Sequence, residues 1–217
     1  VALMYNDLTL AFWLIVAGIV FDFFDGFVAR LLHSSSAIGV QLDSLADVIT
    51  SGLAPAAVLW QVCLQTEPCW LPETWKLGYG VFVLAAFSAL RLAKFNIDET
   101  QTVEFCGLPT PAGSLLCASL GMLWQQGAVA LSSDGGLLIA VLTSLLLVSP
   151  IRMFALKFHG FGWRGNEVRY LFLLASIVLI IILRTYAIPV IIVLYIVVSA
   201  VRWLCMRSGN PDKAPKA

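Results

Sequence analysis

Long apolar segments are the feature that most restricts how this chain of 217 residues can fold. Seven of them are long enough, or nearly so, to cross about 30 Å of hydrocarbon, which takes about 20 helical residues. We place them near residues 8–32, 38–64, 76–97, 110–128, 135–156, 168–184 and 186–206. Each is a continuous apolar run, and lipid offers the backbone no hydrogen bonds, so helices are predicted. The expected fold is all-α, a polytopic bundle of about seven transmembrane helices.

The composition agrees with lipid as the solvent. The chain is 60% hydrophobic and 12% charged, with a mean hydropathy of +0.91, whereas soluble domains are about 25% charged. The formal net charge is zero, which by itself says nothing about partners. From the apolar composition we expect membrane lipids, and no nucleic acid, as partners. We treat residues 1–207 as one transmembrane domain. Residues 208–217, which hold two prolines, a glycine and two lysines, are predicted to be a disordered cytoplasmic tail.

The basic residues are divided unequally between the two ends of the predicted spans. If the spans alternate in direction from Asn6, eleven Lys and Arg residues fall on one side and only Lys76 and Arg184 on the other. Cytoplasmic loops of membrane proteins carry such an excess. The pattern places the connections near 32–37, 97–109 and 159–166 in the cytoplasm. We expect an integral protein of the inner, cytoplasmic membrane.

Four aspartates interrupt the first two apolar segments: Asp22, Asp25, Asp43 and Asp47. A carboxylate near the bilayer centre costs at least ~2.5–3.5 kcal/mol, and such groups normally face an interior site. The first two are spaced i,i+3 and the last two i,i+4, so each pair lies on one face of its helix. Because the two helices are consecutive and antiparallel, we expect the two acidic faces to meet near the cytoplasmic end.

Four converging carboxylates repel one another unless a cation neutralises them. A set made only of carboxylates suits hard divalent ions such as Mg²⁺, Mn²⁺ or Ca²⁺, and a pair of such ions is a recurrent device in phosphoryl transfer. Membrane carboxylates also mark ion paths, so a cation transporter is the alternative from another class. A transport path needs polar residues on several spans, and those at 110–128, 168–184 and 186–206 carry almost none.

Small residues and one arginine accompany the acids. Gly26, Ala29 and Gly39 leave space where a ligand could approach the backbone, although close helix packing also explains small residues. Arg30 ends the first predicted helix, where its guanidinium could bind phosphate oxygens.

The stretch from Asp22 to Asp47 reads D-x2-D-G-x2-A-R-x8-G-x3-D-x3-D. It resembles the signature of the CDP-alcohol phosphatidyltransferase family, and all eight fixed positions match. Eight fixed residues over 26 positions make the resemblance specific. It identifies residues 8–64 as the signature helix pair. The family usually has one further membrane helix before this pair, and we expect residues 1–5 to be its end.

Three further motifs resemble the branch of that family that uses serine: Gly52-Leu-Ala-Pro55, Arg91-Leu-Ala-Lys94-Phe-Asn96, and Phe105-Cys-Gly107-Leu-Pro109-Thr-Pro111. With the signature they cover roughly residues 8–115. Two positions depart from the branch, because its members often have Arg in place of Lys94 and Phe in place of Ser51.

The resemblance implies an enzyme that transfers a phosphatidyl group from CDP-diacylglycerol to a small alcohol. Serine is the expected acceptor, with glycerol 3-phosphate or inositol as the alternatives. The four aspartates would hold two divalent cations, Mg²⁺ or Mn²⁺, and Ca²⁺ could occupy the same site. Asp47 would also be the base for the acceptor hydroxyl. The nucleotide of the donor would lie against Asp22, Gly26, Ala29, Arg30 and Gly39. The resemblance further implies a homodimer.

The acceptor site is predicted from charge. Arg91 and Lys94 lie one turn apart at the cytoplasmic end of their segment, where either could bind the carboxylate of serine. Their alternative role is to anchor the helix at the membrane surface. Asn96 could add a hydrogen bond to the amino group.

Overall fold

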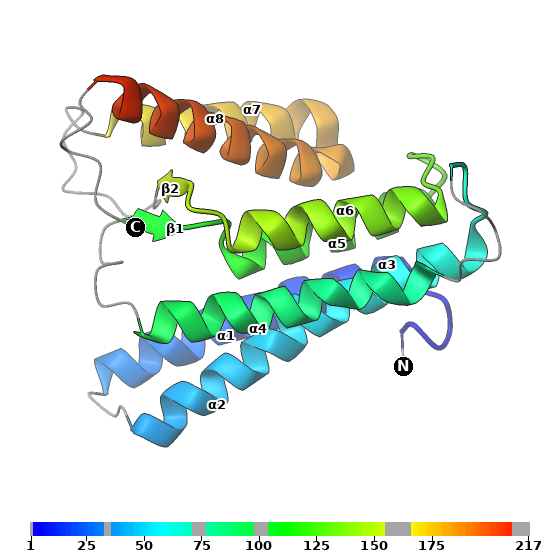
Figure 1. Ribbon diagram of the computed structural model, residues 1–217, viewed down its shortest axis with the longest axis horizontal. Coiled ribbons are helices and arrows are strands. Elements are labelled where there is room, and N and C mark those ends of the chain that lie inside the picture. Colours follow the sequence, from blue (N-terminus) through cyan, green and yellow to red (C-terminus); the bar gives the residue numbers. More distant parts are fainter. Residues whose placement is uncertain (1, 33–35, 71–76, 98–103, 155–165, 210–217) are drawn as a thin grey trace.

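The computed structural model describes residues 2–32, 36–70, 77–97, 104–154 and 166–209. Its helices run back and forth between the two ends of an elongated molecule (Figure 1). In chain order the elements are α1 (Leu8–Leu31), α2 (Ala37–Asp47), the π-helix η1 (Val48–Leu53), α3 (Ala54–Gln65), the 3-10 helix η2 (Leu77–Phe82), α4 (Val83–Ile97), β1 (Glu104–Cys106), α5 (Thr110–Gln125), α6 (Ser133–Leu147), β2 (Arg152–Phe154), α7 (Glu167–Leu183), the 3-10 turn η3 (Arg184–Tyr186) and α8 (Ala187–Gly209).

Four helical stretches of the described chain are long and apolar enough to cross a membrane, at residues 8–29, 38–65, 78–97 and 167–205. The last stretch contains both α7 and α8, which lie side by side because the chain reverses at Arg184, with φ of 49° (Figure 1). α6 is apolar but has only 15 residues, about 22 Å at 1.5 Å per residue. The predicted helical membrane fold is confirmed, whereas the count of seven spans stays a prediction.

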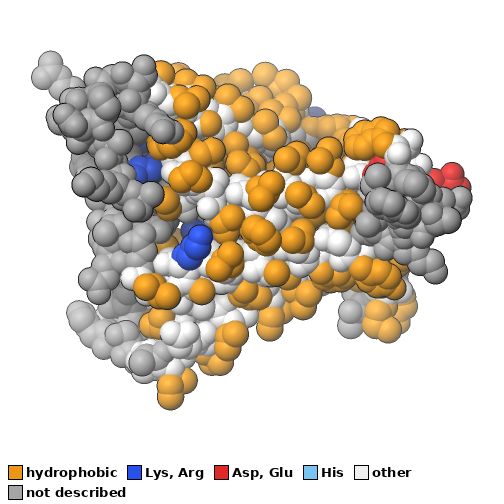
Figure 2. Space-filling view, viewed as in Figure 1, with side chains coloured by type: hydrophobic (Ala, Val, Ile, Leu, Met, Phe, Trp, Pro, Cys, Tyr) orange, Lys and Arg blue, Asp and Glu red, His pale blue; other side chains and the backbone are white. Residues whose placement is uncertain are grey.

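The flanks of the bundle expose many more large apolar side chains than the surface of a soluble protein does. Figure 2 shows hydrophobic side chains over most of the visible flank. Phe21 on α1 is 73% exposed and Ile181 on α7 is 71% exposed. Contiguous apolar surface of this kind marks contact with lipid or another protein, and here it surrounds helices of membrane-spanning length.

Two groups of buried side chains hold the helices together. Phe12 on α1, Val58 on α3 and Met122 on α5 belong to one. Leu59 on α3 and Leu84 on α4 belong to the other. Each is at most 1% exposed. Because α3 contributes to both groups, it fixes α1 relative to α4, and α2 leads into α3 through η1.

The expected helix at 38–64 is present, but it contains a π-helical segment that the sequence did not predict. η1 connects α2 to α3 and packs against both α1 and α4. A Cβ at Gly18 would lie 2.6 Å from Thr50 Cγ2, and one at Gly52 would lie 2.9 Å from Ser88 Cβ. Glycine at both positions therefore permits the close approach of η1 to its neighbours. π-helical turns occur frequently at functional sites, and this one begins directly after Asp47.

The expected span at 135–156 is wrong at its carboxyl end, since α6 ends at Leu147. Pro150 follows, and proline lacks the N–H that a continuing helix needs. Residues 152–154 instead form β2, which pairs with β1 in an antiparallel ladder that the all-α prediction did not include. α8 continues to Gly209, two residues into the predicted disordered tail, and the rest of that tail lies outside the described residues.

Candidate active site

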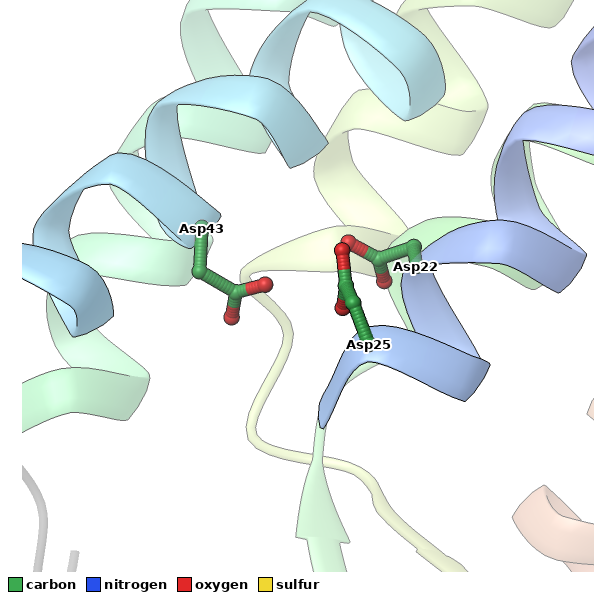
Figure 3. A group of neighbouring side chains, drawn as sticks. All are labelled: Asp22, Asp25 and Asp43. Carbon is green, nitrogen blue, oxygen red and sulfur yellow. The ribbon is translucent and has the colours of Figure 1, made fainter. Parts of the chain in front are cut away.

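Three of the four aspartates come together between the first two helices. Asp22 and Asp25 lie on one face of α1, and Asp43 lies on α2. One carboxylate oxygen from each lies within 4.8 Å of the other two. Figure 3 shows the three carboxyl groups pointing toward a common centre between the helices. The convergence that we predicted from the helical spacing is therefore present for these three residues.

The chemistry of this cluster fits a divalent cation. Asp25 and Asp43 are exposed and Asp22 is half-buried, so a ligand can reach all three. Like charges at this separation repel strongly unless a proton or a cation neutralises them. All the donors are carboxylate oxygens, which suits Mg²⁺, Mn²⁺ or Ca²⁺ and not a soft metal ion.

Asp47 lies one turn beyond Asp43, at the last position of α2. In the part of the chain that the structure describes, it stands apart from the 4.8 Å cluster of the other three. Its Oδ1 accepts a hydrogen bond from the hydroxyl of Ser51, with 3.3 Å between the oxygens. Ser51 is buried in η1, so this hydrogen bond holds the side chain of Asp47 against the π-helix.

The side chain of Arg91 is buried inside the helix bundle. Its side chain is 8% exposed, and Nη1 donates a hydrogen bond of 2.8 Å to Thr110 Oγ1. Its guanidinium carbon lies 5.4 Å from the ring centroid of Phe95, a cation–π contact. Arg91 and Asp47 are also close enough to attract each other electrostatically. The surface-anchor alternative for Arg91 is therefore wrong.

The other two residues of the predicted acceptor site lie farther along α4. Lys94 is exposed, which fits both of its predicted roles. Asn96 is exposed as well, and its Nδ2 donates a hydrogen bond of 2.8 Å to Ser44 Oγ. Since Ser44 follows Asp43 on α2, this bond ties the end of α4 to the acidic helix.

The residues predicted to contact the donor all lie on the same helix pair. Gly26 and Ala29 follow Asp25 on α1 and are half-buried. Gly39 is exposed on α2, and its N–H donates to the capping hydroxyl of Ser36, at 3.0 Å. Arg30 lies in α1, but its side chain is outside the described residues.

Two polar side chains at this site had no predicted role. Ser51 was noted only as a departure from the serine-using branch, and Thr110 only as part of a motif. Their hydrogen bonds join residues on different elements or across a π-helical turn. A serine or threonine in an apolar segment is only a weak indication of a functional site, because such hydroxyls often donate a hydrogen bond to a backbone carbonyl of their own helix.

A family model described as CDP-alcohol phosphatidyltransferase matches residues 1–156 of the chain. The matched range extends from α1 to β2. It therefore contains all four aspartates, Arg91 and Thr110.

Several curated proteins are similar over most of the chain. A CDP-diacylglycerol–serine O-phosphatidyltransferase of Bacillus subtilis is 32% identical over 159 residues, which is 73% of this chain and 82% of that protein. One of the same name from Helicobacter pylori is 31% identical over 200 residues, 90% of this chain and 80% of that protein. Another from Mycobacterium tuberculosis is 34% identical over 220 aligned positions, which cover 94% of this chain and 73% of that protein.

Proposed function

The chain belongs to the CDP-alcohol phosphatidyltransferase family, and on that premise we propose that it transfers the phosphatidyl group of CDP-diacylglycerol to serine. The products are phosphatidylserine and CMP. The observation that carries the proposal is the meeting of Asp22, Asp25 and Asp43 within a pair of membrane-spanning helices. The serine specificity is supported by the names of the similar proteins.

We propose that Asp22, Asp25, Asp43 and Asp47 hold two divalent cations, Mg²⁺ or Mn²⁺, at a site that Ca²⁺ could also occupy. When bound, such ions neutralise charge on the pyrophosphate and make CMP a better leaving group. The nucleotide lies against Asp22, Gly26, Ala29, Arg30 and Gly39 in this proposal. Asp25 and Asp43 are exposed, which suits a donor that arrives from the membrane.

Asp47 is the base in this scheme. As the serine hydroxyl attacks the β-phosphorus of CDP-diacylglycerol, Asp47 accepts its proton. A bond forms between the serine oxygen and that phosphorus, and the phosphorus–oxygen bond to CMP breaks. The hydrogen bond from Ser51 holds one carboxylate oxygen of Asp47. The second oxygen is then oriented for the proton.

Arg91 is the proposed partner of the serine carboxylate. It is buried near Asp47, and the carboxylate of serine is separated from its hydroxyl by only two carbon atoms. A cation that binds the carboxylate must therefore lie close to the base. Lys94 and Asn96 are the further acceptor residues of this proposal, with Asn96 directed at the amino group.

We also propose how the enzyme is oriented in the membrane and that it forms a dimer. If the chain crosses the membrane seven times, the ends of α1 and α4 and the starts of α2 and α5 lie on one side. The excess of Lys and Arg then assigns that side to the cytoplasm. The site then faces the cytoplasm at the inner membrane of the cell, where serine is available. The enzyme is expected to form a homodimer.

Serine-dependent release of CMP tests the proposed activity. Purified protein in detergent, given CDP-diacylglycerol and Mg²⁺, is expected to release one CMP for each phosphatidylserine formed, and very little CMP before serine is added. A protein that only moves cations would release none. Absence of CMP with serine and with every other alcohol, in protein that is folded by circular dichroism, would rule out the proposed activity.

A further inference from the structure

A buried hydroxyl on a neighbouring helix determines how the guanidinium of Arg91 is oriented. Thr110 on α5 is 0% exposed, and its Oγ1 accepts the 2.8 Å hydrogen bond from Arg91 on α4. A guanidinium presents five N–H donors in one rigid plane. The bond to Thr110, together with the ring of Phe95, therefore sets the direction of the donors that remain.

The position of Thr110 is itself fixed by the turn before α5. Gly107 has φ of 76°, and a Cβ there would lie 2.2 Å from the carbonyl oxygen of Leu147 at the end of α6. Its N–H donates to the carbonyl of Ile151, at 2.9 Å. Thr110 follows as the first residue of α5. Because this turn is held against α6, Thr110 cannot move along with Arg91 if that side chain changes its conformation.

Arg91 needs this support because of the charges around it. It attracts Asp47, and without a second partner its flexible side chain could turn toward that carboxylate and pair with it. Such a pair would occupy the carboxylate of the proposed base. It would also leave the guanidinium of Arg91 unable to bind the carboxylate of an incoming serine. The bond to Thr110 opposes this rearrangement by holding one corner of the guanidinium at α5.

We infer that Thr110 is a positioning residue that holds the Arg91 guanidinium where the carboxylate of the acceptor amino acid binds. The inference rests on the proposed function, since it deepens the acceptor site of that reaction. It predicts an effect on serine and not on CDP-diacylglycerol, because the donor lies against α1 and α2 in the proposed scheme.

Thr110→Val tests the inference, because valine has nearly the shape of threonine and lacks the hydroxyl. We expect the KM for serine to rise about tenfold, as befits loss of one hydrogen bond to a charged group, with kcat and the KM for CDP-diacylglycerol within about twofold of wild type. Thr110→Ser keeps the hydroxyl and should restore the serine KM. Ser114→Ala removes a buried hydroxyl one turn along α5 and should leave it unchanged.

Arg91→Ala separates failure of the inference from failure of the proposed function. If Arg91→Ala raises the serine KM and Thr110→Val does not, the inference is overturned and the proposed acceptor site stands. If Thr110→Val instead lowers kcat and the melting temperature and raises both KM values alike, Thr110 is only structural and the inference fails. If the wild type does not use serine, the proposed function fails first. Should Thr110→Val not fold, Thr110→Ala provides the same comparison.

Discussion

Removal of divalent cations with EDTA is expected to abolish CMP release, and Mg²⁺ or Mn²⁺ should restore it. Three carboxylates within 4.8 Å of one another cannot all be ionised beside a pyrophosphate unless positive charge is supplied. The guanidinium of Arg91 donates a hydrogen bond to Thr110 on α5, so it cannot neutralise the whole cluster. We therefore expect the activity of stripped protein to fall to background.

The control for this measurement is EDTA that has been saturated with Mg²⁺ beforehand, which should have no effect. The melting temperature of the protein should also be recorded with and without cation, because loss of fold would remove activity for a different reason. Full turnover by protein shown to be free of metal would contradict the assignment of the aspartates as cation ligands.

Asp47→Asn is expected to lower kcat by about 10²–10⁴-fold, the usual contribution of a general base. Asparagine has the shape of aspartate and can still accept the hydrogen bond from Ser51, but it cannot take a proton from serine. Because Asp47 stands outside the 4.8 Å cluster of the other three acids, the KM for CDP-diacylglycerol should change much less than kcat.

Asp43→Asn is the matched comparison, one turn earlier on the same helix. It removes a member of the cluster itself, so we expect it to weaken donor binding as well as the rate. A near-normal kcat for Asp47→Asn would place the base elsewhere. Loss of donor binding equal to that of Asp43→Asn would make Asp47 chiefly a cation ligand.

The parts of this structure that depend on local patterns were predictable. Apolar length predicted the helix at 8–31, and the helical stretch at 77–97 that begins with the 3-10 helix η2, to within a few residues, because lipid leaves the backbone few alternatives. The i,i+3 spacing of Asp22 and Asp25 placed them on one helical face, and a short connection brought Asp43 opposite. These inferences needed only the geometry of a helix and the order of the segments.

The parts that depend on contacts between distant residues were not predictable from one sequence. The π-helix after Asp47 depends on how closely Gly18 and Gly52 allow their neighbours to approach. The pairing of β1 with β2 requires the chain to return to residues 104–106 some 50 residues later. The bond between Arg91 and Thr110 joins two helices, and an arginine at a helix end was equally compatible with a surface anchor.

The identity of the acceptor is the central claim, and direct competition tests it. Purified protein with Mg²⁺ and CDP-diacylglycerol should be given equal concentrations of serine, glycerol 3-phosphate and inositol, and the lipid products identified by mass spectrometry. We predict phosphatidylserine as the dominant product, because Arg91 supplies a buried cation near Asp47 for an acceptor whose carboxylate is close to its hydroxyl. A dominant product carrying glycerol 3-phosphate or inositol would contradict it.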